Sequence, residues 1–138
     1  MSQRFLMGLD VGGSGGRCLL ADVETGEITT AFRPWTHRRA AHTDGWGLDL
    51  DVRRVWRVLG ETAHEVLSRA RVAPQLVSGV AVTSMRYGMI ALGTDDDELL
   101  AVPNRDARAA SEAMELARLR GDEFYQRTGH WPSPIFAG

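Results

Sequence analysis

Residues 5–23, FLMGLDVGGSGGRCLLADV, decide the fold that this sequence predicts. The apolar run over residues 5–9 is ended by Asp10 and by a glycine-dense segment, residues 12–16, after which extended character resumes over residues 17–23. Short apolar runs separated by glycine are typical of β-strands joined by a tight turn. The segment therefore predicts a strand, a turn and a second strand.

A third strand and a long helix are predicted next. Residues 28–32 are β-branched and aromatic, which favours a strand and completes a β-meander. Residues 33–47 follow neither the helical nor the strand period, so we expect a loop that crosses the sheet edge. From Asp51, a suitable N-cap, apolar residues recur at helical spacing up to Pro74, which predicts a helix.

The second half of the chain predicts three strands and a helix. Residues 77–83 are typical of a buried strand, and residues 89–92 and 99–102 of two further strands. The helix that follows is predicted to be capped by Asp106 and to end at Gly121. This order predicts an α/β fold in which a mixed sheet carries flanking helices, and it disfavours a regularly alternating parallel fold.

Length and composition exclude several classes of protein. The 138 residues fit one domain or part of one, and a net charge of −2 without a dense Lys/Arg stretch argues against a nucleic-acid partner. Cys18 is the single cysteine, so no disulfide framework is available. Residues 1–20 lack the apolar core of a signal peptide, and no apolar stretch reaches membrane-spanning length. We therefore expect a soluble, cytoplasmic protein with no membrane partner.

The turn after the first strand carries the first candidate site. Residues 10–17, DVGGSGGR, place an acid at a strand end beside a turn whose backbone N–H groups can approach an anion closely. Asp10 is the candidate ligand for a Mg²⁺ ion. The segment is neither a Walker A motif nor GxGxxG, because a strand follows it and the glycine spacing differs. Taken by themselves, the glycines are as typical of a flexible hairpin.

Residues 79–88, GVAVTSMRYG, carry the second candidate site. Arg86 can donate several hydrogen bonds to sugar hydroxyls or to a carboxylate, and Tyr87 can stack on a sugar face. These two side chains suit a polyol pocket. The alternative is an exposed arginine at a strand end with an aromatic residue packed beside it.

Two later segments add polar groups. Residues 103–108, PNRDAR, offer the Asn104 amide to a substrate hydroxyl. For Asp106 and Arg108 the alternative is an N-cap and a first-turn salt bridge, and for Asp106 we favour the cap. The last segment, residues 128–134, is TGHWPSP.

These four segments, in this order, resemble the N-terminal part of the FGGY carbohydrate kinases, and most closely their autoinducer-2 kinase branch. Asp10, Gly12 and Arg17 match the family's Asp-x-Gly-Thr phosphate turn and the basic residue after it. Gly13 stands where the family has threonine, and Ser14 supplies a hydroxyl one position later. The resemblance implies phosphate binding by Gly12, Gly13, Ser14 and Arg17, and Mg²⁺ binding by Asp10.

The resemblance also covers the substrate side. Arg86 matches the arginine of the Ser-Met-Arg-x-Gly string of the autoinducer-2 kinase branch, whereas Tyr87 replaces the glutamate that accepts a substrate hydroxyl. Asp106 and Arg108 match the family's Trp-x-Asp-x-Arg segment, with Asn104 in the place of the tryptophan. The implied substrate-binding residues are Arg86, Tyr87 and Asn104, and the identity of the sugar is not implied.

For the fold, the resemblance implies a partial actin-like ATPase domain of the ribonuclease H-like type, shared with hexokinase and the Hsp70 chaperones. Residues 1–138 would form the N-terminal part of the first kinase domain, and the second, nucleotide-binding domain would be absent. The implied cofactors are ATP and Mg²⁺, the implied substrate is a small sugar or polyol, and no catalytic residue is expected in this chain because the general base would lie downstream. We expect the chain to be inactive by itself, and a homo-oligomer of the intact enzyme is left open.

Two other interpretations stay open at this point. A noncatalytic binding or regulatory domain with an actin-like half-fold is favoured by Gly13 and Tyr87. A kinase or ATPase from another branch of the superfamily would keep the Asp10 turn, and its other matches would be coincidental.

Overall fold

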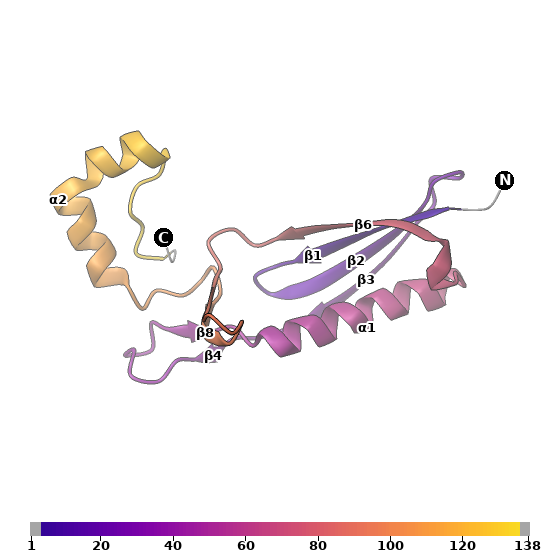
Figure 1. Ribbon diagram of the computed structural model, residues 1–138, viewed down its shortest axis with the longest axis horizontal. Coiled ribbons are helices and arrows are strands. Elements are labelled where there is room, and N and C mark those ends of the chain that lie inside the picture. The colour runs from indigo at the N-terminus through magenta and orange to yellow at the C-terminus, as the bar shows by residue number, and fades with distance from the viewer. Residues whose placement is uncertain (1–3, 136–138) are drawn as a thin grey trace. The chain divides into compact units, whose positions relative to one another are not determined.

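A four-stranded mixed sheet forms the centre of one of two compact units (Figure 1). The computed structural model describes residues 4–135, so residues 1–3 and 136–138 of the predicted domain lie outside the described part. The first unit comprises the chain up to residue 36 together with residues 52–85. The second unit comprises residues 37–51 and the chain from residue 86 onward.

The sheet of the first unit has the strand order β3-β2-β1-β6. Its strands are β1 (Phe5–Val11), β2 (Gly15–Asp22), β3 (Ile28–Pro34) and β6 (Val77–Ser84). β2 pairs with β1 and β3 in antiparallel fashion, whereas β6 joins β1 in parallel. The predicted meander, the later strand and the mixed character of the sheet are therefore confirmed.

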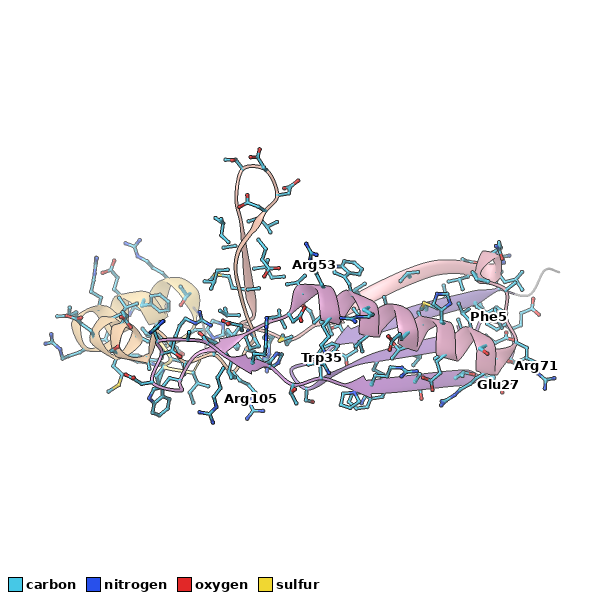
Figure 2. All side chains as sticks on the ribbon, turned by 90° about the horizontal axis from the view of Figure 1, so that it is seen from below. Phe5, Glu27, Trp35, Arg53, Arg71 and Arg105 are labelled. Atoms are coloured by element: carbon cyan, nitrogen blue, oxygen red, sulfur yellow. The ribbon has the colours of Figure 1, made fainter. Side chains whose placement is uncertain are left out.

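Helix α1 (Val52–Ala70) packs against one face of this sheet. Because side chains alternate along a strand, every second residue of β1 and β2 points toward the helix. The buried core cluster consists of Phe5, Met7, Cys18, Leu20, Ala31 and Val66. In Figure 2, which is seen from below, α1 lies in front of the strands of the sheet. Each large apolar side chain buried here stabilises the fold by about 1.5–3 kcal/mol. A short 3-10 helix, η1 (Pro74–Leu76), leads from α1 into β6.

The prediction that residues 77–83 form a buried strand is wrong with respect to burial. Val80 and Val82 of β6 are 59% and 64% exposed. β6 lies at the sheet edge beside β1, while α1 packs mainly against β2 and β3. Of this strand, Val77 packs against the buried core cluster, whereas the residues that follow it are mostly exposed.

The second unit contains two small sheets. β4 (Arg38–Arg39) pairs with β5 (Leu48–Asp49), and β7 (Met89–Leu92) pairs with β8 (Glu98–Val102). The Leu50 N–H donates to the Ala101 carbonyl oxygen at 2.9 Å and ties the two sheets together. The strands predicted at residues 89–92 and 99–102 are confirmed. The loop predicted over residues 33–47 is wrong in part, since β4 pairs within the second unit.

Helix α2 (Ala110–Thr128) begins later than predicted. Its N-cap is Ala109, which makes no side-chain capping hydrogen bond. The prediction that Asp106 caps this helix is therefore wrong, because the Asp106 carboxylate is used elsewhere, by the Leu48 N–H and the Arg108 guanidinium.

The predicted end of this helix at Gly121 is also wrong. The backbone leaves helical geometry at Arg120, with φ −144°, and the helix then resumes and ends at Gly129, which has φ 74°. A Cβ on the buried Gly121 would lie 2.6 Å from the ring of Trp131. Gly121 thus marks a kink with close ring packing, whereas Gly129 has the left-handed conformation typical of a helix end.

No helix within residues 4–135 is long and apolar enough to span a bilayer.

Candidate functional site

The glycine turn connects β1 to β2. The Gly12 N–H donates to the Gly15 carbonyl oxygen at 3.0 Å, so Gly12 itself shapes the turn. Asp10 and Arg17 are partners in the β1–β2 register, and Nη1 of Arg17 lies 3.6 Å from Oδ2 of Asp10. Their side chains are 42% and 57% exposed, so this pair is open to solvent and contributes at most about 1 kcal/mol to stability. The structure thus brings Asp10, Gly12 and Arg17 together at one turn.

An open cleft of about 360 Å³ lies beside this ion pair. It is lined by Gly8, Leu9, Asp10, Arg17, Leu19, Ala81, Val82 and Thr83. Side-chain alternation places Asp10 on the face of the sheet opposite the buried Met7. The Arg17 guanidinium lies 5.6 Å from the ring centroid of Phe32, a cation–π contact. The cleft therefore presents the Arg17 guanidinium, which can pair with an anion, and the Asp10 carboxylate, which can take a cation, next to the strand ends that the glycine turn joins.

The metal-binding capacity of this turn rests on Asp10. Residues 4–135 contain no group of three or more His, Cys, Asp or Glu side chains that could enclose a metal ion. Mg²⁺ is usually held by one or two carboxylates, and waters and substrate phosphates complete its shell. A half-exposed carboxylate beside a glycine turn fits a Mg²⁺ ion that keeps most of its water and phosphate ligands, and it does not fit an all-protein metal cage.

In the second unit, Arg86 and Tyr87 lie next to each other as predicted. The Arg86 guanidinium is 5.9 Å from the Tyr87 ring centroid. The Tyr87 hydroxyl lies 3.5 Å from Nδ1 of His130, and the two rings are perpendicular at 6.0 Å. Tyr87 has φ 64°, a left-handed conformation that costs about 1–3 kcal/mol in a bulky residue. His130 carries no pairwise spacing signal in the sequence, so sequence reasoning missed this contact.

Tyr87 also faces a mainly apolar pocket of about 350 Å³. The lining consists of Tyr87, Ala109, Glu112, Ala113, Leu116, Phe124, Thr128, His130, Trp131, Pro132 and Ser133. Both halves of α2 contribute to it, and Trp131 is held by stacking on Tyr125 with centroids 5.5 Å apart. Asn104 is not part of the lining that the described residues form.

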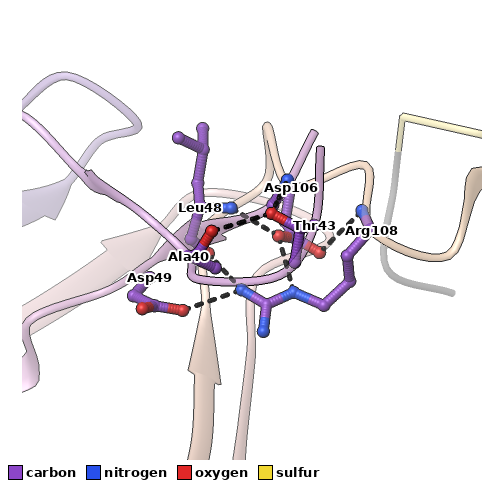
Figure 3. A network of polar contacts seen from close by, with 7 residues as sticks. Ala40, Thr43, Leu48, Asp49, Asp106 and Arg108 are labelled. Atoms are coloured by element: carbon purple, nitrogen blue, oxygen red, sulfur yellow. Dashed lines mark hydrogen bonds and ion pairs between the residues drawn. The ribbon is translucent and has the colours of Figure 1, made fainter. Parts of the chain in front are cut away.

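Asp106 and Arg108 form a polar network with β5 (Figure 3). The buried Asp106 carboxylate accepts from the Leu48 N–H at 2.7 Å and from Nε of Arg108 at 2.9 Å. Nη2 of Arg108 donates to the Leu48 carbonyl oxygen at 2.7 Å and to Asp49 at 2.8 Å. Burial alone would lower the pKa of Arg108, but the hydrogen bonds to Asp49 and Asp106 raise it. In this structure, both residues hold residues 103–108 against β5.

Asn104 is the remaining predicted substrate residue. Its Oδ1 is buried and has no hydrogen-bond partner among residues 4–135. An unpaired buried carbonyl oxygen costs about 1–3 kcal/mol. The predicted contact between this amide and a substrate hydroxyl stays a prediction.

Comparison with known sequences agrees with the resemblance. The FGGY family of carbohydrate kinases, N-terminal domain, matches residues 5–138. The autoinducer-2 kinase of Escherichia coli (strain SMS-3-5 / SECEC) is 31% identical over 132 residues, which are 93% of this chain and 25% of that protein. The autoinducer-2 kinase of Photorhabdus laumondii subsp. laumondii is 28% identical over 123 residues, which are 89% of this chain and 23% of that protein. This chain thus spans about a quarter of the length of these curated relatives.

Solved structures share the fold. The gluconate kinase from Lactobacillus acidophilus superposes with a TM-score of 0.79 at 18% identity over 97% of this chain and 26% of that one. The xylulose kinase from Rhodospirillum rubrum has a TM-score of 0.77 at 23% identity over 96% of this chain and 27% of that one. At these identities the likeness shows the fold alone, which is the expected partial actin-like ATPase fold. Since the family match begins at β1 and runs to the last residue, this chain belongs to the FGGY family of carbohydrate kinases.

Proposed function

We propose that this chain is the N-terminal part of the first domain of an ATP-dependent carbohydrate kinase. The intact enzyme transfers the γ-phosphate of ATP to a hydroxyl of a sugar or polyol. The observation that carries the proposal is the exposed Asp10–Arg17 pair beside the glycine turn. Both residues line a cleft of about 360 Å³, and the chain belongs to a family of kinases.

At this turn the proposed roles divide between backbone and side chains. Gly12 shapes the turn through its bond to Gly15, and the segment that continues with Gly13 and Ser14 meets the phosphate. Arg17 pairs with phosphate oxygens, while Asp10 holds Mg²⁺, which neutralises phosphate charge when it is bound. Because Asp10 and Arg17 are 3.6 Å apart, a Mg²⁺–phosphate unit would replace an exposed, weak ion pair.

On the acceptor side, Arg86, Tyr87 and Asn104 bind the sugar or polyol. Arg86 donates hydrogen bonds to hydroxyls, and the Tyr87 ring stacks on a sugar face. The strained backbone of Tyr87, at φ 64°, supports a functional role, since strain of this kind concentrates at binding sites. The same proposal places the enzyme in the cytoplasm, without nucleic-acid or membrane partners.

Phosphoryl transfer needs more than this chain supplies. A general base near the attacking hydroxyl, a clamped triphosphate and a closure that excludes water are all required. We assign the base and the nucleotide-binding domain to sequence outside this chain, which spans a quarter of its relatives' length. The 138-residue chain by itself is therefore expected to show no turnover.

The test begins with the protein purified from its native cells. An intact mass well above 15.2 kDa, together with ATP consumption that depends on one member of a sugar panel, is the expected result. Asp10→Ala should then abolish turnover, whereas Asp95→Ala in the exposed acidic turn should leave it unchanged. Full activity of the Asp10→Ala enzyme would contradict the assignment.

A second function is a noncatalytic binding domain. It is favoured by Gly13 in place of the threonine and by Tyr87, whose hydroxyl is already within 3.5 Å of His130. A native mass of 15.2 kDa without ATP consumption would support this second function over the first.

A further inference from the structure

Two aromatic rings enclose the start of β2 from opposite sides. Gly15 and Gly16 are consecutive strand residues, so a side chain on each would point to a different face of the sheet. A Cβ on Gly15 would lie 2.5 Å from the Phe32 ring, and a Cβ on Gly16 would lie 2.9 Å from the Trp35 ring. Each ring thus rests directly on glycine backbone, which explains glycine at both positions through packing.

Trp35 is fixed to the turn in a second way. Its backbone N–H donates to the Ser14 carbonyl oxygen at 3.0 Å. Trp35 is buried, with 5% of its surface exposed. Leu59 of α1 reaches the same place, because a Cβ added at Gly16 would lie 3.0 Å from Leu59 as well as close to the Trp35 ring. The indole is therefore held between β2 and α1, and it connects the end of the glycine turn to this helix.

Phe32 acts on the other face. Its ring covers Gly15, and the Arg17 guanidinium lies 5.6 Å from its centroid. Because the Arg17 side chain is 57% exposed, this cation–π contact restricts a guanidinium that would otherwise sample many rotamers. Phe32 thereby orients the cationic group of the cleft.

We propose that Trp35 and Phe32 are positioning residues that hold the glycine turn and Arg17 in the conformation that binds phosphate. This inference rests on the proposed phosphate-binding function of the turn. Glycine has more conformational freedom than any other residue, so a turn with this many glycines is costly to order. When only a fraction of the molecules has the competent shape, the apparent Kd rises by the inverse of that fraction.

The first experiment measures binding of inorganic tripolyphosphate with Mg²⁺ to the 138-residue chain by calorimetry. Trp35→Leu should raise Kd about tenfold, as expected if the competent fraction falls to about one tenth. Trp35→Phe should restore most of the affinity, because it keeps an aromatic ring and removes an indole N–H that has no acceptor among residues 4–135. Phe32→Leu should weaken binding less, since it releases Arg17 while Trp35 still holds the turn.

The second experiment reads the turn directly. The chain has four tryptophans, and Trp35 alone remains in a triple variant that carries Trp46→Phe, Trp56→Phe and Trp131→Phe. Its fluorescence should change when tripolyphosphate is added, and the concentration that gives half of the change should equal the Kd from calorimetry. A matched variant that keeps only Trp56, whose side chain is 71% exposed on α1, should show no change.

The outcomes separate this inference from the function on which it rests. If the wild-type chain binds no tripolyphosphate, the phosphate-binding function and the inference both fall. If it binds, but Trp35→Leu is folded and binds equally well while the Trp35 signal stays flat, the positioning role alone is overturned. Should Trp35→Leu fail to fold, the Trp35 fluorescence decides: a saturable change supports the role, and a flat signal overturns it.

Discussion

Arg108 places Nε 2.9 Å from Oδ1 of Asp106, and the same oxygen accepts the Leu48 N–H at 2.7 Å. These two residues stand close in the chain, yet their contacts extend to a strand some sixty residues earlier. The pair therefore joins two segments of the second unit that the sequence keeps far apart.

Arg108→Ala should destabilise the second unit. It would leave the Asp106 carboxylate, which is 3% exposed, without its cation, and losing one partner of a buried pair costs about 3–5 kcal/mol. Hydrogen exchange should show earlier opening of the Leu48 amide. Arg105→Ala, at an exposed neighbouring position, is the control and should leave this exchange unchanged. Unchanged Leu48 protection in Arg108→Ala would contradict the assigned role.

The Cys18 thiol should be unreactive in the folded chain. It is fully buried, and burial raises the pKa of this thiol. The thiol of the unfolded chain ionises near its ordinary pKa of about 8.5, whereas the folded chain keeps the thiol protonated to higher pH. The stability that the protonated thiol contributes is therefore fully present below about pH 8.5 and is lost as the pH rises through the raised pKa of the folded chain. Denaturant melts across alkaline pH should therefore show falling stability, with a smaller slope in Cys18→Ala. An equal slope in the two proteins would assign the pH dependence to other groups.

Gly60→Ala should stabilise α1. Gly60 is exposed within the helix, and among residues 4–135 no atom lies within 4 Å of the Cβ that alanine would add. Replacing glycine with alanine in a helix interior gains about 0.5–1 kcal/mol. Denaturant melts measure this gain. Gly16→Ala is the opposite case, because its Cβ would lie 2.9 Å from the Trp35 ring, and it should destabilise the same unit.

The local elements could be predicted because their signals are local. The glycine turn between β1 and β2 and the apolar period of α1 are set by neighbouring residues, and both appear where the sequence indicates. The salt bridge of Asp106 with Arg108 is a local contact, and the sequence indicates it as one of the alternatives for this pair. The second partner of Asp106, the Leu48 N–H, is brought near by tertiary structure, which no local pattern reports.

The candidate site follows the same division. Asp10 and Arg17 were predictable because they flank one turn, so that antiparallel pairing makes them neighbours. The contact of Tyr87 with His130 and the packing of Trp35 on Gly16 join residues that no spacing rule connects. The glycines at positions 15 and 16 were visible in the sequence, but a glycine does not show which ring approaches it.

The exposed edge strand β6 gives the last prediction, which also separates the two proposed functions. Residues 77–84, VSGVAVTS, carry no charge and no proline, and an unprotected edge of this kind is a template for pairing with another chain. We expect the 138-residue chain to bind a hydrophobic dye and to self-associate. Val82→Lys should reduce both at a cost below about 0.5 kcal/mol, because Val82 is 64% exposed.

Sedimentation velocity over a range of concentrations measures this effect. Val23→Lys is the matched control, since Val23 is a similarly exposed valine, at 56%, in a turn outside the edge strand, and it should leave self-association unchanged. Self-association that survives Val82→Lys would place the interface elsewhere. A wild-type chain that is monomeric and binds no dye would behave as a finished domain, and it would favour the noncatalytic binding function over the partial kinase.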